Sequence, residues 1–281
     1  MKWQGRKKSS NVDDRRASSS GRRGASIGGA GAIIILLISL IFGGPEAVLQ
    51  NLGYLNQSGG NSTYVETEED KEMAEFISVI LADTEYVWGE IFDDLDREYQ
   101  EPKLVLYHDY VSSACGSTSS AVGPFYCPGD QTVYIDLDFF EELRTKYKAA
   151  GDFAIAYVVS HEVGHHVQTL LGITEQMQDI RSRVSQEEYN QFSVRFELQA
   201  DYLSGVWANW VEDMGYLEAG DIQEAIRAAE AVGDDAIQKA ARGYVIPDSF
   251  THGTSEQRSY WFYLGFETGD LSNWDTFNNE I

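Results

Sequence analysis

The sequence His161-Glu162-Val163-Gly164-His165-His166 lies within an apolar stretch, residues 153–171. On an α-helix, residues four positions apart share a face, so this spacing predicts that His161 and His165 point in the same direction. Two imidazoles in this arrangement can bind one Zn²⁺, and Glu162 can act as a general base towards water at the metal. The motif therefore predicts a metal-dependent hydrolase.

The residues on both sides of the motif indicate that its helix is buried. The alternative is a surface helix with accidental histidines, because His is often half exposed in proteins. The flanking residues are too apolar for that: Ala154, Ile155, Tyr157, Val158, Val159, Val167, Leu170 and Leu171. We therefore expect the two histidines to be metal ligands on a core helix.

A second helical pattern, over residues 193–207, supplies a third candidate ligand. Glu197 and Asp201 are four positions apart, and burying two carboxylates is costly unless a metal, His or Arg compensates their charge. Zinc held by two histidines takes a third protein ligand and keeps its fourth position for water. Glu197 is the predicted third ligand, and Asp201 is predicted to accept the N–H of a zinc-bound imidazole. The alternative is a salt bridge from either acid to Arg195 or Arg183.

Charge is distributed unevenly along the 281 residues, whose formal net charge is −24. Residues 1–45 carry eight basic and two acidic side chains, which leaves 13 basic and 43 acidic side chains for residues 46–281. Such an acidic domain repels nucleic acid and anionic lipid surfaces, so no nucleic-acid partner is expected.

The N-terminal region has the composition of a membrane anchor. Residues 1–25 are basic and rich in Ser and Gly, which predicts a disordered cytoplasmic tail. Residues 26–45 carry no charge and are predicted to form a transmembrane helix, followed by a linker over residues 46–66. The basic flank orients the predicted single-pass protein with its catalytic domain outside the cell membrane. A signal peptide cleaved near residues 43–45 is the alternative.

The rest of the chain, residues 67–281, reads as one α+β domain that is mostly helical with a small sheet. The predicted helices cover residues 67–100, 139–148, 153–171, 193–207, 221–232 and 234–242, and the predicted strands cover residues 103–107 and 132–137. Gly172 is expected to end the histidine-bearing helix, and the polar residues 174–190 to cross the surface. The second strand is expected to be an edge strand that aligns an extended peptide.

Cys115 and Cys127 are the two cysteines of the chain. An even count in a segment predicted to lie outside the cell favours a disulfide between them. Two buried free thiols are the alternative. A cysteine-based metal site is disfavoured because no histidine or second cysteine pair is close in sequence.

The remaining histidines have less specific surroundings. His252 lies in a loop, residues 244–258, and can donate a hydrogen bond to a tetrahedral oxyanion or cap the helix that follows. Tyr244 is an alternative oxyanion donor. His166 is expected either to support the metal site or to be exposed, and His108, at the end of a strand, to be structural.

Several of these segments together resemble the neutral zinc metallopeptidase family of bacteria. They are the His161 motif, Glu197-Leu-Gln-Ala-Asp201, Pro247-Asp-Ser-Phe-Thr-His-Gly, Met1-Lys-Trp-Gln-Gly-Arg, Asn11-Val-Asp-Asp-Arg-Arg, Ser113-Ala-Cys-Gly and Gly123-Pro-Phe-Tyr-Cys. The resemblance implies a membrane-anchored, zincin-like peptidase of the gluzincin type, with His161, His165 and Glu197 on zinc and Glu162 catalytic. The Thr-His-Gly-x-x-x-x-Arg258 loop is also similar to a loop of another membrane-associated gluzincin family. This chain has Tyr202 and Trp274 where relatives often carry cysteines, which excludes a second disulfide.

The expected function is hydrolysis of peptide bonds in a peptide or protein substrate, with Zn²⁺ as cofactor and Glu162 as general base. Two alternatives stay open at this stage. One is a zinc hydrolase of a non-peptide amide, and the other is a non-catalytic membrane scaffold in which a fourth protein ligand replaces water on the zinc.

Overall fold

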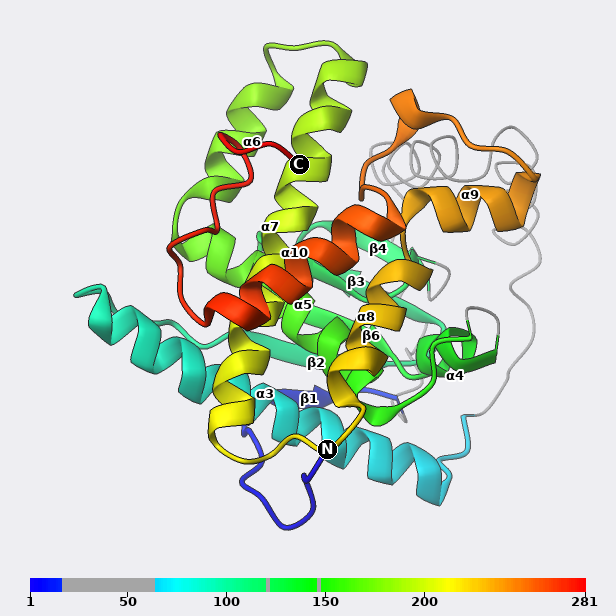
Figure 1. Ribbon diagram of the computed structural model, residues 1–281. Helices are drawn as coiled ribbons and strands as arrows, with labels where there is room; N and C mark the ends of the chain where they lie inside the picture. Colours follow the sequence, from blue (N-terminus) through cyan, green and yellow to red (C-terminus); the bar gives the residue numbers. More distant parts are fainter. Residues whose placement is uncertain (17–63, 120–121, 146–147) are drawn as a thin grey trace.

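The computed structural model describes residues 1–16, 64–119, 122–145 and 148–281, which form helices packed around a small sheet (Figure 1). The helices are α3 (Glu68–Asp94), α4 (Asp138–Thr145), α5 (Asp152–Leu170), α6 (Ile173–Arg181), α7 (Gln186–Asp213), α8 (Asp221–Ala231), α9 (Asp234–Arg242), the short 3₁₀ helix η2 (Pro247–Ser249) and α10 (Ser255–Thr268). The strands are β1 (Val12–Asp14), β2 (Lys103–Tyr107), β3 (Tyr110–Ser113), β4 (Gly116–Ser119), β5 (Phe125–Cys127) and β6 (Thr132–Asp136).

Helix α5, which carries the histidine motif, lies among the other long helices. It contacts α3, α6, α7 and α8, and its apolar residues form part of the main core. Directly after α5, Gly172 adopts a left-handed conformation with a φ of 84°, which ends the helix where the sequence predicts. The polar residues 174–190 that follow lie mostly at the surface, as predicted, and they form α6 and the first turn of α7.

Helix α7 is longer than the predicted 193–207 because a capping box between Ser185 and Glu188 starts it two turns earlier. Helix α10 packs against α7 and α8 (Figure 1). The contact between α7 and α10 is close: a Cβ added to Gly265 would lie 2.0 Å from the carbonyl oxygen of Tyr202. Helix α10 is therefore held tightly against the helix that carries Glu197 and Asp201.

The strand order of the main sheet is β1-β2-β6-β5. Strand β1 runs parallel to β2, β2 runs parallel to β6, and β5 runs antiparallel to β6. The prediction that residues 132–137 form the edge strand is therefore wrong, because β6 is paired on both sides. All five residues of β6 are buried, as is typical of an internal strand, and the edge beside α5 is β5.

Strands β3 and β4 form a separate antiparallel hairpin. Cys115 lies in the turn of this hairpin, and its sulfur is bonded to that of Cys127, the last residue of β5. The disulfide thus ties the hairpin to the edge strand of the main sheet.

Residues 1–16 are folded against the domain, in contrast to the disordered tail expected for residues 1–25. Trp3 is only 8% exposed and packs edge-on against Phe76 of α3, with 5.5 Å between the ring centres. Basic side chains of the segment pair with acids of the domain, and Arg6 does so with Asp83. Composition alone predicted disorder because it takes no account of these acidic partners or of the pairing of β1 with β2.

The two ends of the undescribed segment, residues 17–63, lie next to each other. The Arg16 guanidinium donates to the Tyr64 hydroxyl over 3.0 Å and to a Glu66 carboxylate oxygen over 2.9 Å. These contacts join the described residues before and after the gap within one folded unit.

The structure corrects the predictions of an N-terminal transmembrane helix and of a single-pass location in the cell membrane. In the part of the chain that the structure describes, no helix combines the length and the apolar character needed to cross a membrane. The predicted segment itself, residues 26–45, lies outside the described residues.

Candidate metal site

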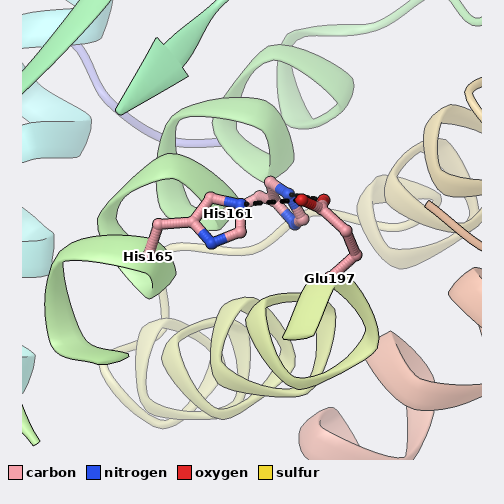
Figure 2. Close-up of side chains that lie close together, drawn as sticks. All are labelled: His161, His165 and Glu197. Carbon is pink, nitrogen blue, oxygen red and sulfur yellow. Dashed lines mark hydrogen bonds and ion pairs between the residues drawn. The ribbon is translucent and has the colours of Figure 1, made fainter. Parts of the chain in front are cut away.

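Helices α5 and α7 bring His161, His165 and Glu197 together (Figure 2). The Nε2 atom of His161 lies 3.2 Å from one carboxylate oxygen of Glu197, and Nε2 of His165 lies 3.5 Å from the other. One potential ligand atom from each of the three residues lies within 4.8 Å of the others. The helices can approach this closely because Gly164 has no side chain: a Cβ there would lie 3.0 Å from the carbonyl oxygen of Ala200.

Buried groups on the Nδ1 side of the His161 ring fix its orientation. Its Nδ1 lies 2.8 Å from a carboxylate oxygen of Asp201, which is fully buried. Asp201 also accepts hydrogen bonds from the Tyr157 hydroxyl (2.5 Å) and from Nε of Arg258 (2.9 Å). Burial alone would lower the pKa of His161, but the Asp201 carboxylate raises it to about 9. Nδ1 is thus engaged by Asp201, and Nε2 faces Glu197.

The His165 ring is oriented in the same way by a different residue. Gln168, also buried, donates its amide N–H to the carbonyl oxygen of Phe196 over 2.7 Å, so its side-chain oxygen is available to accept. That oxygen lies 2.8 Å from Nδ1 of His165, which must therefore carry the proton. Nε2 of His165 faces Glu197 and is the ring nitrogen positioned to bind a metal.

The donor set fits a zinc ion. Two imidazole nitrogens and one carboxylate oxygen are the donors of many three-ligand zinc sites. Burial alone would raise the pKa of Glu197, but the charges of His165 and His252 hold that pKa well below its usual range, so the carboxylate is ionised. Among the described residues, the group of possible metal ligands at this position consists of these three side chains. Such a set leaves one tetrahedral position for water or substrate.

The three residues open onto a cavity of about 590 Å³. Glu162, His252 and Arg258 also line it. Glu162 is largely buried beside His161 on α5.

His252 reaches the cavity through a loop organised by Asp234. One Asp234 oxygen accepts the backbone N–H groups of Thr251, His252 and Gly253 over 2.7, 2.6 and 3.1 Å. The other oxygen lies 3.4 Å from Nδ1 of His252. The cap of α10 is Thr254 rather than His252, and this observation disfavours the capping alternative.

The other residues singled out in the sequence lie away from the three ligands. Tyr244 is 60% exposed and lines a separate hollow with Lys239 and Val245. His108, at the end of β2, lies near Asp136 and Asp138.

The proposed salt-bridge partners of Glu197 and Asp201 have other contacts. Arg195 donates to the carbonyl oxygens of Thr276 and Asn279, and Arg183 pairs with Asp179. Arg258 from α10 is the arginine that binds Asp201.

His166 is fully buried, so the alternative of an exposed side chain does not hold. Its Nε2 lies 2.6 Å from the carbonyl oxygen of Gln100, and its Nδ1 lies 3.0 Å from the Tyr126 hydroxyl. Burial lowers the pKa of His166, which keeps the ring neutral.

Sequence reasoning missed four supporting residues: Tyr157, Gln168, Asp234 and Arg258. Two of them carried a usable signal. Gln168 is a polar residue in an apolar helix, one turn after His165, and Arg258 is a charged residue at the end of the His252 loop.

Two histidines on one buried helix and a carboxylate on its neighbour define a protein with a zinc-type metal site. Residues 1–277 match the family described as "Putative neutral zinc metallopeptidase", and the chain belongs to that family. Membership implies Zn²⁺ as the cofactor and a peptidase as the class of enzyme, in agreement with the resemblance seen in the sequence.

The relatives include "Uncharacterized protein YpfJ" of Escherichia coli K12, which is 46% identical over 292 residues and matches the whole length of both chains. Another is "Uncharacterized protein Rv2575" of Mycobacterium tuberculosis H37Rv, which is 45% identical over 191 residues, 64% of each chain. No solved structure matches the chain significantly.

Proposed function

We propose that this protein is a zinc-dependent peptidase in which His161, His165 and Glu197 hold the metal and Glu162 is the general base. The observation that carries the proposal is the orientation of the two imidazoles. Asp201 and Gln168 engage the Nδ1 atoms, so both Nε2 atoms are directed at Glu197. A pair of buried histidines with a purely structural role would not need this arrangement.

A zinc ion at this site would polarise the scissile carbonyl and lower the pKa of a water molecule beside it. Glu162 accepts the proton of the attacking water and delivers it to the leaving amine. His252, which shares the cavity, donates an N–H to the oxyanion as it forms. Asp201 keeps His161 oriented throughout, and Arg258 and Tyr157 hold Asp201 in place.

The surroundings of the site favour a peptide over a small non-peptide amide. Strand β5 is an edge strand, and Phe125 and Tyr126 of this strand line the cavity. An extended peptide can add to such an edge through main-chain hydrogen bonds. The other apolar residues that line the cavity would accommodate an apolar side chain of the peptide: Val122, Pro124, Pro128, Phe139, Val158, Phe196, Val232 and Ile237. The three-ligand set disfavours a scaffold with structural zinc, because that role uses a fourth protein ligand.

The test compares the 281-residue chain with its Glu162→Gln variant in zinc content and in cleavage of a peptide library. The variant should keep the metal, because all three ligands remain, and should lose turnover because the base is gone. Equal cleavage by the two proteins would refute the role of Glu162. A zinc-loaded wild type that cleaves no peptide would refute the proposed activity.

A further inference from the structure

The third histidine of the motif, His166, joins the zinc-binding helix to the edge strand of the sheet. It directly follows the ligand His165 on α5, and its side chain reaches Tyr126 of β5 and the backbone of Gln100. Tyr99 packs edge-on against the same ring, with 5.8 Å between the ring centres. The imidazole thus fills a buried position between α5 and the sheet.

The hydrogen bonds of His166 have one consistent direction. A carbonyl oxygen can only accept, so the 2.6 Å contact with Gln100 places the ring proton on Nε2. In the neutral ring Nδ1 then has no proton, and it accepts the hydroxyl proton of Tyr126 over 3.0 Å. The Tyr126 side chain is therefore bound to a specific atom one residue away from a zinc ligand.

Strand β5 is short, and it is fixed on both of its faces. On one face Tyr126 reaches His166. On the other face Phe125 stacks on Tyr134 of β6, with 4.9 Å between the ring centres, and Cys127 is bonded to Cys115. The second set of contacts fixes β5 to the sheet and the hairpin. The contact between Tyr126 and His166 fixes β5 to the helix that carries the metal ligands.

We infer that His166 is a positioning residue that, through Tyr126, sets the distance between the edge strand β5 and the metal site. The inference rests on the proposed function, since the distance matters for a peptide that lies along β5 with its scissile carbonyl at the zinc. Catalytic groups must be held to within about half an ångström of their productive geometry. The hydrogen bond between Tyr126 of β5 and His166, the residue next to the ligand His165, provides such a constraint.

The test variant is Tyr126→Phe, which removes one hydroxyl and keeps the aromatic ring. The matched control is Tyr134→Phe, which removes a hydroxyl bonded to Asp130 on the same sheet and leaves the ring that stacks on Phe125. Both proteins are compared with the wild type for a long peptide that spans β5 and for a short one that reaches only the metal. Zinc content is measured in parallel.

Loss of one hydrogen bond should raise the KM of Tyr126→Phe for the long peptide by about three- to tenfold. Its kcat and KM for the short peptide and its zinc content should stay close to those of the wild type, and Tyr134→Phe should behave like the wild type throughout. Equal effects of the two variants would overturn the inference. So would a loss of zinc and of short-peptide turnover in Tyr126→Phe, because that would show a general structural role.

Hydrogen exchange of residues 125–127 gives a readout that does not depend on activity. Exchange should be faster in Tyr126→Phe and unchanged in Tyr134→Phe. If the wild type cleaves no peptide, the proposed function fails, and hydrogen exchange alone then tests whether His166 anchors β5. Faster exchange in Tyr126→Phe only would support the anchoring role. Equal exchange in both variants would overturn it.

Discussion

The close approach of α5 and α7 at Gly164 provides a quantitative test of what sets the spacing of the metal ligands. In Gly164→Ala the new methyl group would lie 3.0 Å from the carbonyl oxygen and 3.2 Å from the Cα atom of Ala200. Both distances are shorter than normal contacts, and the neighbouring atoms are backbone. The two helices must therefore separate by a few tenths of an ångström, and Glu197 lies on α7 less than one turn before Ala200.

Two opposing effects determine the stability of this variant. Replacing Gly by Ala inside a helix stabilises a protein by about 1 kcal/mol, whereas overpacking a core costs about 1–3 kcal/mol. The matched control is Gly89→Ala on α3, where the new methyl group has no other atom within 4 Å. The control should gain about 1 kcal/mol. Gly164→Ala should be less stable than the control by roughly 1–3 kcal/mol.

Thermal unfolding of the metal-free and zinc-loaded proteins measures both consequences. In chains of roughly 150–250 residues, 1 kcal/mol shifts the Tm by about 2–4 °C. Displaced ligands should also weaken zinc binding about tenfold in Gly164→Ala, so that zinc raises its Tm less than it raises the Tm of the wild type. If Gly164→Ala is as stable as Gly89→Ala and binds zinc as tightly as the wild type, close helix packing does not set the ligand spacing.

Three further predictions concern other parts of the structure. Glu197→Ala should lose most of the bound zinc, whereas Asp201→Asn should bind zinc about 10–100-fold more weakly than the wild type. If metal analysis finds that Asp201→Asn loses more zinc than Glu197→Ala, Asp201 is the ligand and Glu197 the supporting residue. His252→Gln should retain zinc and lower kcat about 10²-fold, as expected for one oxyanion donor, and an unchanged kcat would leave His252 with a structural role. Trp3→Ala should reduce the free energy of unfolding by about 3–5 kcal/mol, and a denaturant midpoint equal to that of the wild type would show that the N-terminal segment does not stabilise the domain.

Local sequence patterns predicted several helices and one strand correctly. Residues 103–107 form β2 as predicted, and the helices predicted over residues 153–171, 221–232 and 234–242 agree with α5, α8 and α9 to within a residue or so at each end. The spacing of His161, His165 and Glu197 placed the three side chains on two helix faces that the structure brings together.

Features that depend on contacts between distant segments were not predictable in this way. Residues 132–137 were mistaken for an edge strand because their outer neighbour β5 has only three residues and too short a pattern to predict. Strand β1 was missed because it comes from a basic segment whose composition indicated disorder. Hydropathy over residues 26–45 indicated a membrane span, whereas no helix of the described residues is long and apolar enough to cross a membrane. Asp234 and Arg258 support the site from elements far along the chain, and a single charged residue in a helix has no periodic signature.

The pairing of β1 with β2 has a consequence for how the protein folds. Val12 pairs with Leu104, so closing this contact joins parts of the chain about 90 residues apart and carries a loop-closure cost of about 4 kcal/mol. During synthesis β1 leaves the ribosome long before its partner strand exists. Trp3 must therefore stay undocked while the chain that forms α3 and β2 emerges. Residues 1–14 are thus expected to be among the last to reach their native contacts, so that substitutions there should mainly speed unfolding rather than slow folding.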